Sequence, residues 1–168
     1  MKKAALFIGS FLIFQTLHAQ QLADPSLFDF WVGKWDLTWD DGEGKTGKGT
    51  NHIVKTLDGK VIQENFEAIS GNFQGFKGTS LTVYNPKNKI WKQAWADNQG
   101  GYFDFTGEVD GTKRIFATTQ RNKDGKTIIQ RMVFYNITTD ALTWDWESSE
   151  DAGKNWKLLW RINYKKAS

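Results

Sequence analysis

Two charged residues interrupt apolar faces of predicted strands, and their side chains could do chemistry if those faces are buried. Glu64 shares its parity with Ile62 and Phe66, and Arg131 shares its parity with Val133. Burial beside aromatic groups raises the pKa of a carboxyl group, so Glu64 could act as a general acid or base. A guanidinium forks onto carboxylates and phosphates, so Arg131 could hold an acidic ligand. Two other arrangements stay open: the two residues form a buried brace, or these faces point outward.

Alternation also brings several tryptophans and one amide to shared faces. Trp91, Gln93 and Trp95 occupy every second position, as do Trp144 and Trp146. A pocket lined by these side chains would suit a flat, apolar ligand. Core packing explains the same residues, and exposed tryptophans could instead stack on sugar rings. The predicted ligand-binding residues are Glu64, Trp91, Gln93, Trp95, Arg131, Trp144 and Trp146.

The composition limits other kinds of chemistry. The chain has 168 residues, no cysteine and two histidines. The lack of cysteine excludes disulfides, thiolate zinc sites, iron–sulfur clusters and a thiol nucleophile, and two histidines cannot form a His-rich metal site. No Gly-x-Ser-x-Gly elbow, Gly-rich phosphate loop or His-Glu-x-x-His motif occurs. We therefore expect no metal ion and no cofactor, and we assign no catalytic residue.

The first residues have the pattern of a secretory signal peptide. Lys2 and Lys3 precede an apolar run over 4–14, which is too short to span a membrane permanently. We expect cleavage after Ala19, a mature domain over 20–168 and a periplasmic or secreted location. Loss of the two lysines would bring the 22 basic residues close to the 19 acidic ones, which leaves nucleic-acid binding without an electrostatic basis.

The remaining chain has the pattern of antiparallel strands and short turns. In Leu142, Trp144 and Trp146 the apolar residues share one parity and polar residues take the other, which is typical of a sheet with one wet face. The turn signals divide the chain into about nine or ten strands after one short helix, between Pro25 and Gly33. We predict an all-β, antiparallel up-and-down barrel, because closure removes the exposed edges. More than eight strands would enclose room for a ligand.

The stretch Gly33-Lys34-Trp35, after a short helix, resembles the lipocalin (calycin) signature. From about residue 27 to 164 the chain is similar to a bacterial lipocalin-like secreted family, domain of unknown function 1579. The shared features include Phe28-Asp29-Phe30-Trp31 before that signature and Lys89-Ile90-Trp91 followed by Trp95. The resemblance implies that Trp35 closes the narrow end of the barrel, with Arg161 lying across its ring. It implies no established reaction.

Together these patterns predict a secreted or periplasmic lipocalin-like protein that binds a small, partly apolar or amphipathic ligand inside the barrel. Two alternatives stay open. One is a cofactor-free isomerase or cyclase of the calycin type that uses Glu64 and Arg131. The other is a carbohydrate-binding module that stacks tryptophan rings on sugars.

Overall fold

The computed structural model describes residues 24–168, which form one antiparallel sheet of eleven strands. The expected signal peptide, residues 1–19, and its cleavage site lie outside the described residues. The strands are β1 (Gly33–Asp40), β2 (Thr46–Thr56), β3 (Val61–Ser70), β4 (Lys77–Asn85), β5 (Ile90–Asp97), β6 (Tyr102–Asp110), β7 (Lys113–Thr118), β8 (Arg121–Lys123), β9 (Lys126–Tyr135), β10 (Ala141–Ser149) and β11 (Lys157–Lys166).

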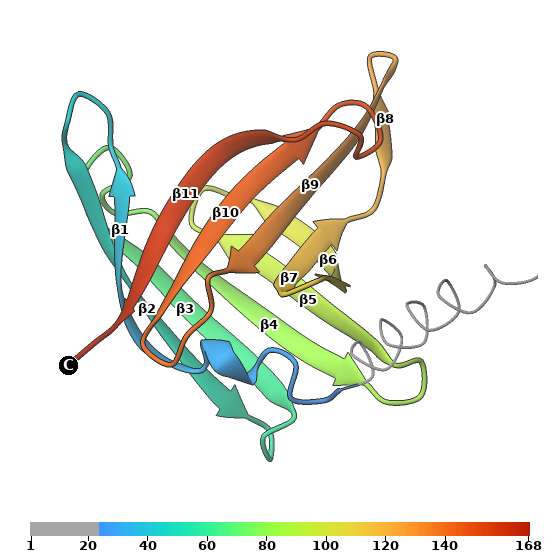
Figure 1. Ribbon diagram of the computed structural model, residues 1–168, viewed down its shortest axis with the longest axis horizontal. Helices are drawn as coiled ribbons and strands as arrows, with labels where there is room; N and C mark the ends of the chain where they lie inside the picture. The colour runs from blue at the N-terminus through green and yellow to red at the C-terminus, as the bar shows by residue number, and fades with distance from the viewer. Residues whose placement is uncertain (1–23) are drawn as a thin grey trace, which may run out of the picture.

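Ten of these strands close into a barrel (Figure 1). Each strand pairs with its neighbour in sequence, except that β7 pairs with β9, and the circle closes where β1 pairs with β11. The short β8 pairs only with β9 and extends that hairpin beyond the barrel wall. The predicted all-β antiparallel barrel is confirmed.

The short helix expected near the N-terminus is a 3-10 turn. It is η1 (Asp29–Trp31), at the lower end of the barrel in Figure 1, and it is the one helical element among residues 24–168. The segment has little room for more, because Asp24 ties down the preceding turn through the Ser26 N–H and β1 already begins at Gly33. One turn is enough to place the side chains of Phe28 and Trp31 in the end of the barrel. A longer helix would need residues that already belong to β1.

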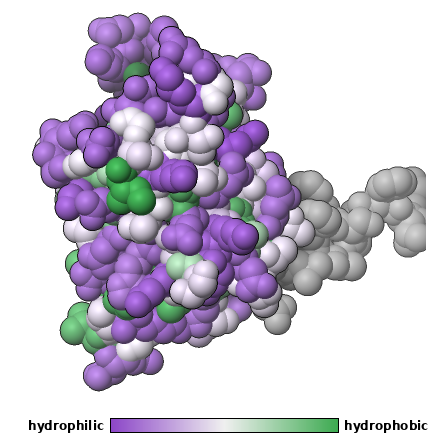
Figure 2. Space-filling model, turned by 90° about the vertical axis from the view of Figure 1, so that its left-hand side faces the viewer, coloured by the Kyte–Doolittle hydropathy of each residue, from purple (hydrophilic) through white to green (hydrophobic). Residues whose placement is uncertain are grey.

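Alternation along each strand separates an apolar interior from a polar exterior. In β1, the side chains of Trp35, Leu37 and Trp39 are buried, and those of Lys34 and Asp36 are exposed. Figure 2 shows the result on one face of the molecule, which is mostly hydrophilic with scattered hydrophobic residues. No helix in the described part of the chain is long and apolar enough to cross a membrane.

Aromatic packing closes the η1 end. Phe28 is fully buried, stacks on Phe116 at 4.2 Å between ring centroids and meets the edge of Trp91 at 5.1 Å. The Trp35 indole N–H donates a 2.7 Å hydrogen bond to the Trp31 carbonyl, which ties η1 to β1. The expectation that Trp35 closes this end is confirmed.

The cation on the Trp35 ring is a lysine, and the expectation that it is Arg161 is wrong. The Lys166 ammonium lies 4.1 Å from the ring centroid and donates to the Val32 carbonyl at 2.9 Å. Arg161 instead donates hydrogen bonds to both carboxylate oxygens of Asp145, at 2.8 and 2.7 Å. The reason is parity: Lys166 occupies an inward position of β11, and Arg161 occupies an outward one.

Candidate ligand-binding site

A cavity of about 340 Å³ occupies the end of the barrel opposite η1. The alternation that buries apolar residues on each strand also points large aromatic side chains into this space. Its aromatic wall is formed by Phe66, Trp95, Phe103, Trp144, Trp146 and Trp160. The rings brace one another edge to face, for example Trp144 against Trp160 at 6.1 Å and Trp146 against Phe103 at 5.4 Å. Edge-to-face pairs of this kind hold the rings in fixed orientations.

A glycine beneath one of these rings helps to keep the cavity open. A Cβ atom at Gly78, on β4, would lie only 2.0 Å from the nearest atom of the Trp95 ring on β5. The indole therefore lies flat over the glycine, on the barrel wall. Gly47 and Gly49 on β2 make the same room for Trp39. A larger side chain at Gly78 would force the Trp95 ring to move.

The loop between β3 and β4 covers part of the mouth. Phe73 and Phe76 of this loop line the cavity, and Phe73 lies 4.7 Å from the Trp160 ring while remaining 44% exposed. Asp41 holds the loop by accepting hydrogen bonds from the Asn72 backbone N–H, at 2.8 Å to the nearer carboxylate oxygen. The cavity opens to solvent beside the exposed ring of Phe73.

A cluster of polar side chains borders the cavity inside the barrel. One Glu64 carboxylate oxygen accepts a 2.6 Å hydrogen bond from the Asn51 amide, and the other accepts a 2.7 Å bond from the Ser80 hydroxyl. The same Asn51 amide group donates to the Tyr164 hydroxyl at 3.2 Å. We call these four residues the Glu64 cluster; Glu64 and Tyr164 also line the cavity.

The environment of the cluster favours neutral forms of its acids. Only 4% of the Glu64 surface is exposed, and burial raises the pKa of its carboxyl group to about 7, although the bonds from Ser80 and Asn51 oppose the rise. Burial, with the nearby Glu64 charge, likewise raises the pKa of the Tyr164 hydroxyl. Glu64 can therefore exchange a proton near neutral pH, and a ligand in the cavity can change its protonation state by shifting its pKa.

A second carboxylate lies at the mouth of the cavity. Asp97 accepts hydrogen bonds from the Gly101 and Gln99 backbone N–H groups, at 2.8 and 3.0 Å, and from the Trp95 indole at 3.1 Å. Partial burial works to raise the pKa of Asp97, but these bonds outweigh it and hold the pKa below its ordinary value. Asp97 thus stays ionised at neutral pH.

The structure brings together four of the seven predicted site residues. Glu64, Trp95, Trp144 and Trp146 all line the cavity. The other three predicted residues, Trp91, Gln93 and Arg131, do not line it.

Trp91 and Gln93 face the barrel interior, but both side chains are used in packing. The Trp91 indole donates to the Asp24 carbonyl at 3.1 Å, which helps to close the η1 end. The Gln93 amide donates to the Thr82 hydroxyl at 2.8 Å, and both residues are fully buried. The alternation in the sequence shows that a side chain faces the barrel interior. It does not show whether that side chain lies at the η1 end or at the cavity end.

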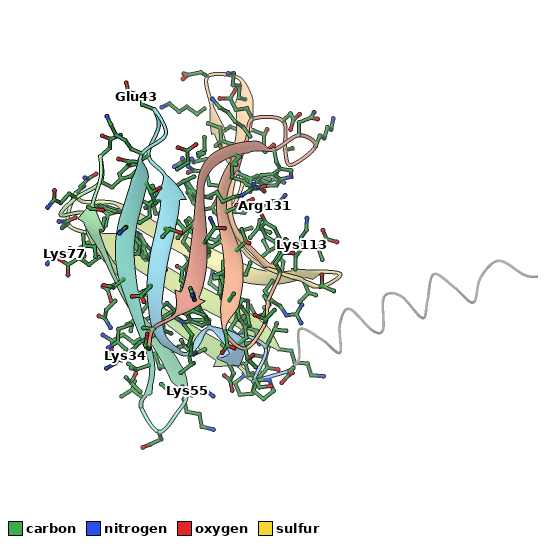
Figure 3. The ribbon with its side chains drawn as sticks, turned by 60° about the vertical axis from the view of Figure 1, so that its left-hand side comes forward. Lys34, Glu43, Lys55, Lys77, Lys113 and Arg131 are labelled. Atoms are coloured by element: carbon green, nitrogen blue, oxygen red, sulfur yellow. The ribbon has the colours of Figure 1, made fainter. Side chains whose placement is uncertain are left out.

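Arg131 lies on the outside of the barrel, so both its expected role in the cavity and the expected brace with Glu64 are wrong. Arg131, which is labelled in Figure 3, is ion-paired with Glu147 across the β9–β10 ladder, with 2.6 Å between Nε and the carboxylate. The Trp156 ring covers its guanidinium at 3.6 Å. The inward positions of β9 belong to Met132 and Phe134. An acidic ligand in the cavity therefore has no arginine at this position to bind it.

The sequence analysis missed the partners of Glu64. Asn51 comes from β2, Ser80 from β4 and Tyr164 from β11, so only the closed barrel brings them together. A signal was present for Asn51, which interrupts an inward-facing series of small and apolar residues on β2 in the same way that Glu64 does on β3. Among the described residues, no three histidine or carboxylate side chains are grouped so that they could hold a metal ion.

Comparisons with known proteins add little to this geometry. No family model matches the chain, so its resemblance to domain of unknown function 1579 is not supported, and no curated protein matches it. A solved structure from Nostoc punctiforme, described as a protein of unknown function from the DUF3598 family, resembles it at a TM-score of 0.23 and 8% sequence identity. The match covers 88% of this chain and 99% of that one.

Proposed function

We propose that the protein binds a small, partly apolar molecule inside the barrel. The observation that carries this proposal is the cavity of about 340 Å³, which stays open between braced aromatic rings. A volume of this size, with apolar walls and few polar groups, is typical of small-molecule sites. The N-terminal sequence pattern further supports the proposal that the protein works in the periplasm or outside the cell.

The two alternative functions have less support. An isomerase or cyclase that used Glu64 and Arg131 would need both groups in one site, but they lie on opposite sides of the barrel wall. A carbohydrate-binding module would need exposed tryptophan rings. All nine tryptophans lie in the described part of the chain, and four of them are buried. The five that are partly exposed either line the cavity or, in the case of Trp156, pack under Arg131.

Gly78→Val is expected to weaken ligand binding by at least about tenfold, which corresponds to about 1.4 kcal/mol. The added side chain must displace the Trp95 ring, which itself lines the cavity. Binding of phenylbutanol, a neutral amphipathic probe, can be measured by titration calorimetry and by the change in tryptophan emission. Valine suits a strand, so the change should not itself disrupt β4.

The matched control is Leu81→Val, on the same strand but exposed on the outer surface. This variant should bind phenylbutanol as the unmodified protein does, with one saturable site per chain. Equal affinities of the Gly78→Val variant and the unmodified protein would place the bound probe elsewhere. Absence of saturable binding to the unmodified protein would count against the proposed function.

A further inference from the structure

The charges around the cavity are of one sign. Of the described residues that line it, the two with a carboxyl group are Glu64 and Asp97, and none is a lysine, arginine or histidine. The lysines labelled in Figure 3, which are Lys34, Lys55, Lys77 and Lys113, are exposed. Lys166, the inward-facing lysine of β11, is engaged at the closed end by Trp35 and Val32. The cavity thus lacks a built-in counter-charge for Glu64.

The Glu64 cluster also has acceptor sites that receive no hydrogen bond from the described residues. A carboxylate has about four lone-pair sites, and the structure shows one hydrogen bond to each Glu64 oxygen. The Asn51 side-chain oxygen is buried and receives no hydrogen bond from the described residues. Unpaired buried acceptors are unfavourable, so a ligand that brought hydrogen-bond donors would gain more here than one that brought acceptors.

The aromatic wall favours the same kind of ligand. Phe66, two positions along β3 from Glu64, lies 6.3 Å from the Trp95 ring and 5.9 Å from the Trp160 ring. Aromatic faces attract cations through the ring quadrupole, and the attraction grows when water is excluded. The same rings offer apolar surface to an uncharged hydrocarbon or aromatic body.

We propose that the ligand is a small organic amine, whose ammonium group is held by Glu64 and whose apolar body lies between the tryptophans. This inference rests on the proposed function and deepens it. It differs from the acidic ligand that Arg131 could have held, because Arg131 lies outside the barrel and a carboxylate, Glu64, lies inside. Asp97 adds a second negative charge at the mouth of the cavity, which a cationic ligand would pass.

The proposal also makes binding depend on pH. The groups that face Glu64 are Asn51 from β2, Ser80 from β4 and Tyr164 from β11, with Asp97 farther out at the mouth. None of these is a base that could neutralise Glu64. Burial leaves the Glu64 pKa at about 7 in the free protein, and a bound ammonium favours the ionised form and so lowers that pKa. Binding of an amine therefore releases a proton near pH 6, and its affinity should rise between about pH 6 and 8.

The test is a matched series of three probes with the same carbon skeleton: phenylbutylamine, phenylbutanol and phenylbutyrate. Affinities for the full chain are measured by titration calorimetry at pH 6 and pH 8. Glu64→Gln removes the charge but keeps a side chain that can hydrogen-bond with Asn51 and Ser80. Arg131→Gln removes a charge from the outer surface and is the control for general electrostatic effects.

At pH 8 the amine should bind about ten- to hundredfold more tightly than the alcohol, which matches the strength of a charge-assisted hydrogen bond, and the carboxylate should bind more weakly than the alcohol. Glu64→Gln should abolish the preference for the amine over the alcohol, while Arg131→Gln should keep that preference.

An alcohol that binds as tightly as the amine at both pH values would overturn the proposed amine and leave the proposed function standing. Lack of binding by all three probes would overturn both. The comparison of probes on the unmodified protein needs no variant, so the test holds even if Glu64→Gln fails to fold.

Discussion

The free energy of unfolding is expected to fall by about 3 kcal/mol as the pH rises from about 4.5 to 7, through the titration of Glu64 alone. The pKa of this carboxyl group is raised from 4.5 to about 7 on folding, mainly by burial. Between these two values the unfolded chain has lost the proton and the native protein still holds it. Stability from this group is thus fully present below pH 4.5 and is lost as the pH rises through 7.

Urea unfolding at pH 4.5, 6, 7 and 8 measures this effect, with Glu64→Gln as the variant in which the dependence should disappear. The difference in unfolding free energy between the two proteins should change by about 3 kcal/mol across the range. Glu67→Gln is the matched control, since Glu67 is on the same strand but forms a surface ion pair with Lys77. A constant difference between the unmodified protein and Glu64→Gln would show that Glu64 is not buried as described.

Trp35→Ala is expected to lower the free energy of unfolding by about 3–5 kcal/mol, the range for removing a buried tryptophan. The Trp35 side chain is only 1% exposed and ties β1 to two other elements: to η1 through the Trp31 carbonyl, and to β11 through the Tyr164 ring and the Lys166 ammonium. Its loss would leave a cavity at the closed end and an uncovered lysine charge.

Trp35→Phe separates the parts of this effect. It keeps an aromatic ring against Tyr164 and Lys166 but removes the indole N–H, so we expect a loss of about 1–2 kcal/mol. Urea unfolding at one pH measures both variants. A loss below about 1 kcal/mol for Trp35→Ala would contradict the view that this tryptophan closes the barrel.

Alternation predicted the fold well where one face of a strand is polar. Leu142, Trp144 and Trp146 are separated by polar residues, and the structure places all three on the inner side of β10. Alternation on β3 also agrees with the inward position of Glu64 in the structure, because its neighbours of opposite parity include charged and polar residues, although the sequence left an outward position open.

Alternation failed for Arg131 because β9 is apolar on both faces. Val133 lies outside the barrel but is still buried, since Ile115 and Ala117 of β7 form a small apolar cluster with it on the outer surface. Parity alone therefore could not tell the inside of β9 from the outside. The cross-strand partner, Glu147, would have been a better guide, because charge pairs of this kind favour the wet face.

The partners of Glu64 could not be predicted in the same way. Asn51 and Tyr164 are separated by 113 positions in the chain, and their hydrogen bond exists only because β1, β2 and β11 are adjacent in the closed barrel. The charge of the cavity depends on which residues lie at the same height along the barrel axis. That in turn depends on the register of all the strands, which the sequence does not show.

The most direct measurement is a crystal structure of the protein with phenylbutylamine at pH 8. We expect electron density for the phenyl ring between Trp95 and Trp146, and the ammonium group within hydrogen-bond distance of a Glu64 carboxylate oxygen. An amine bound outside the barrel, or a cavity filled by its own aromatic side chains, would rule out Glu64 as the group that holds the amine.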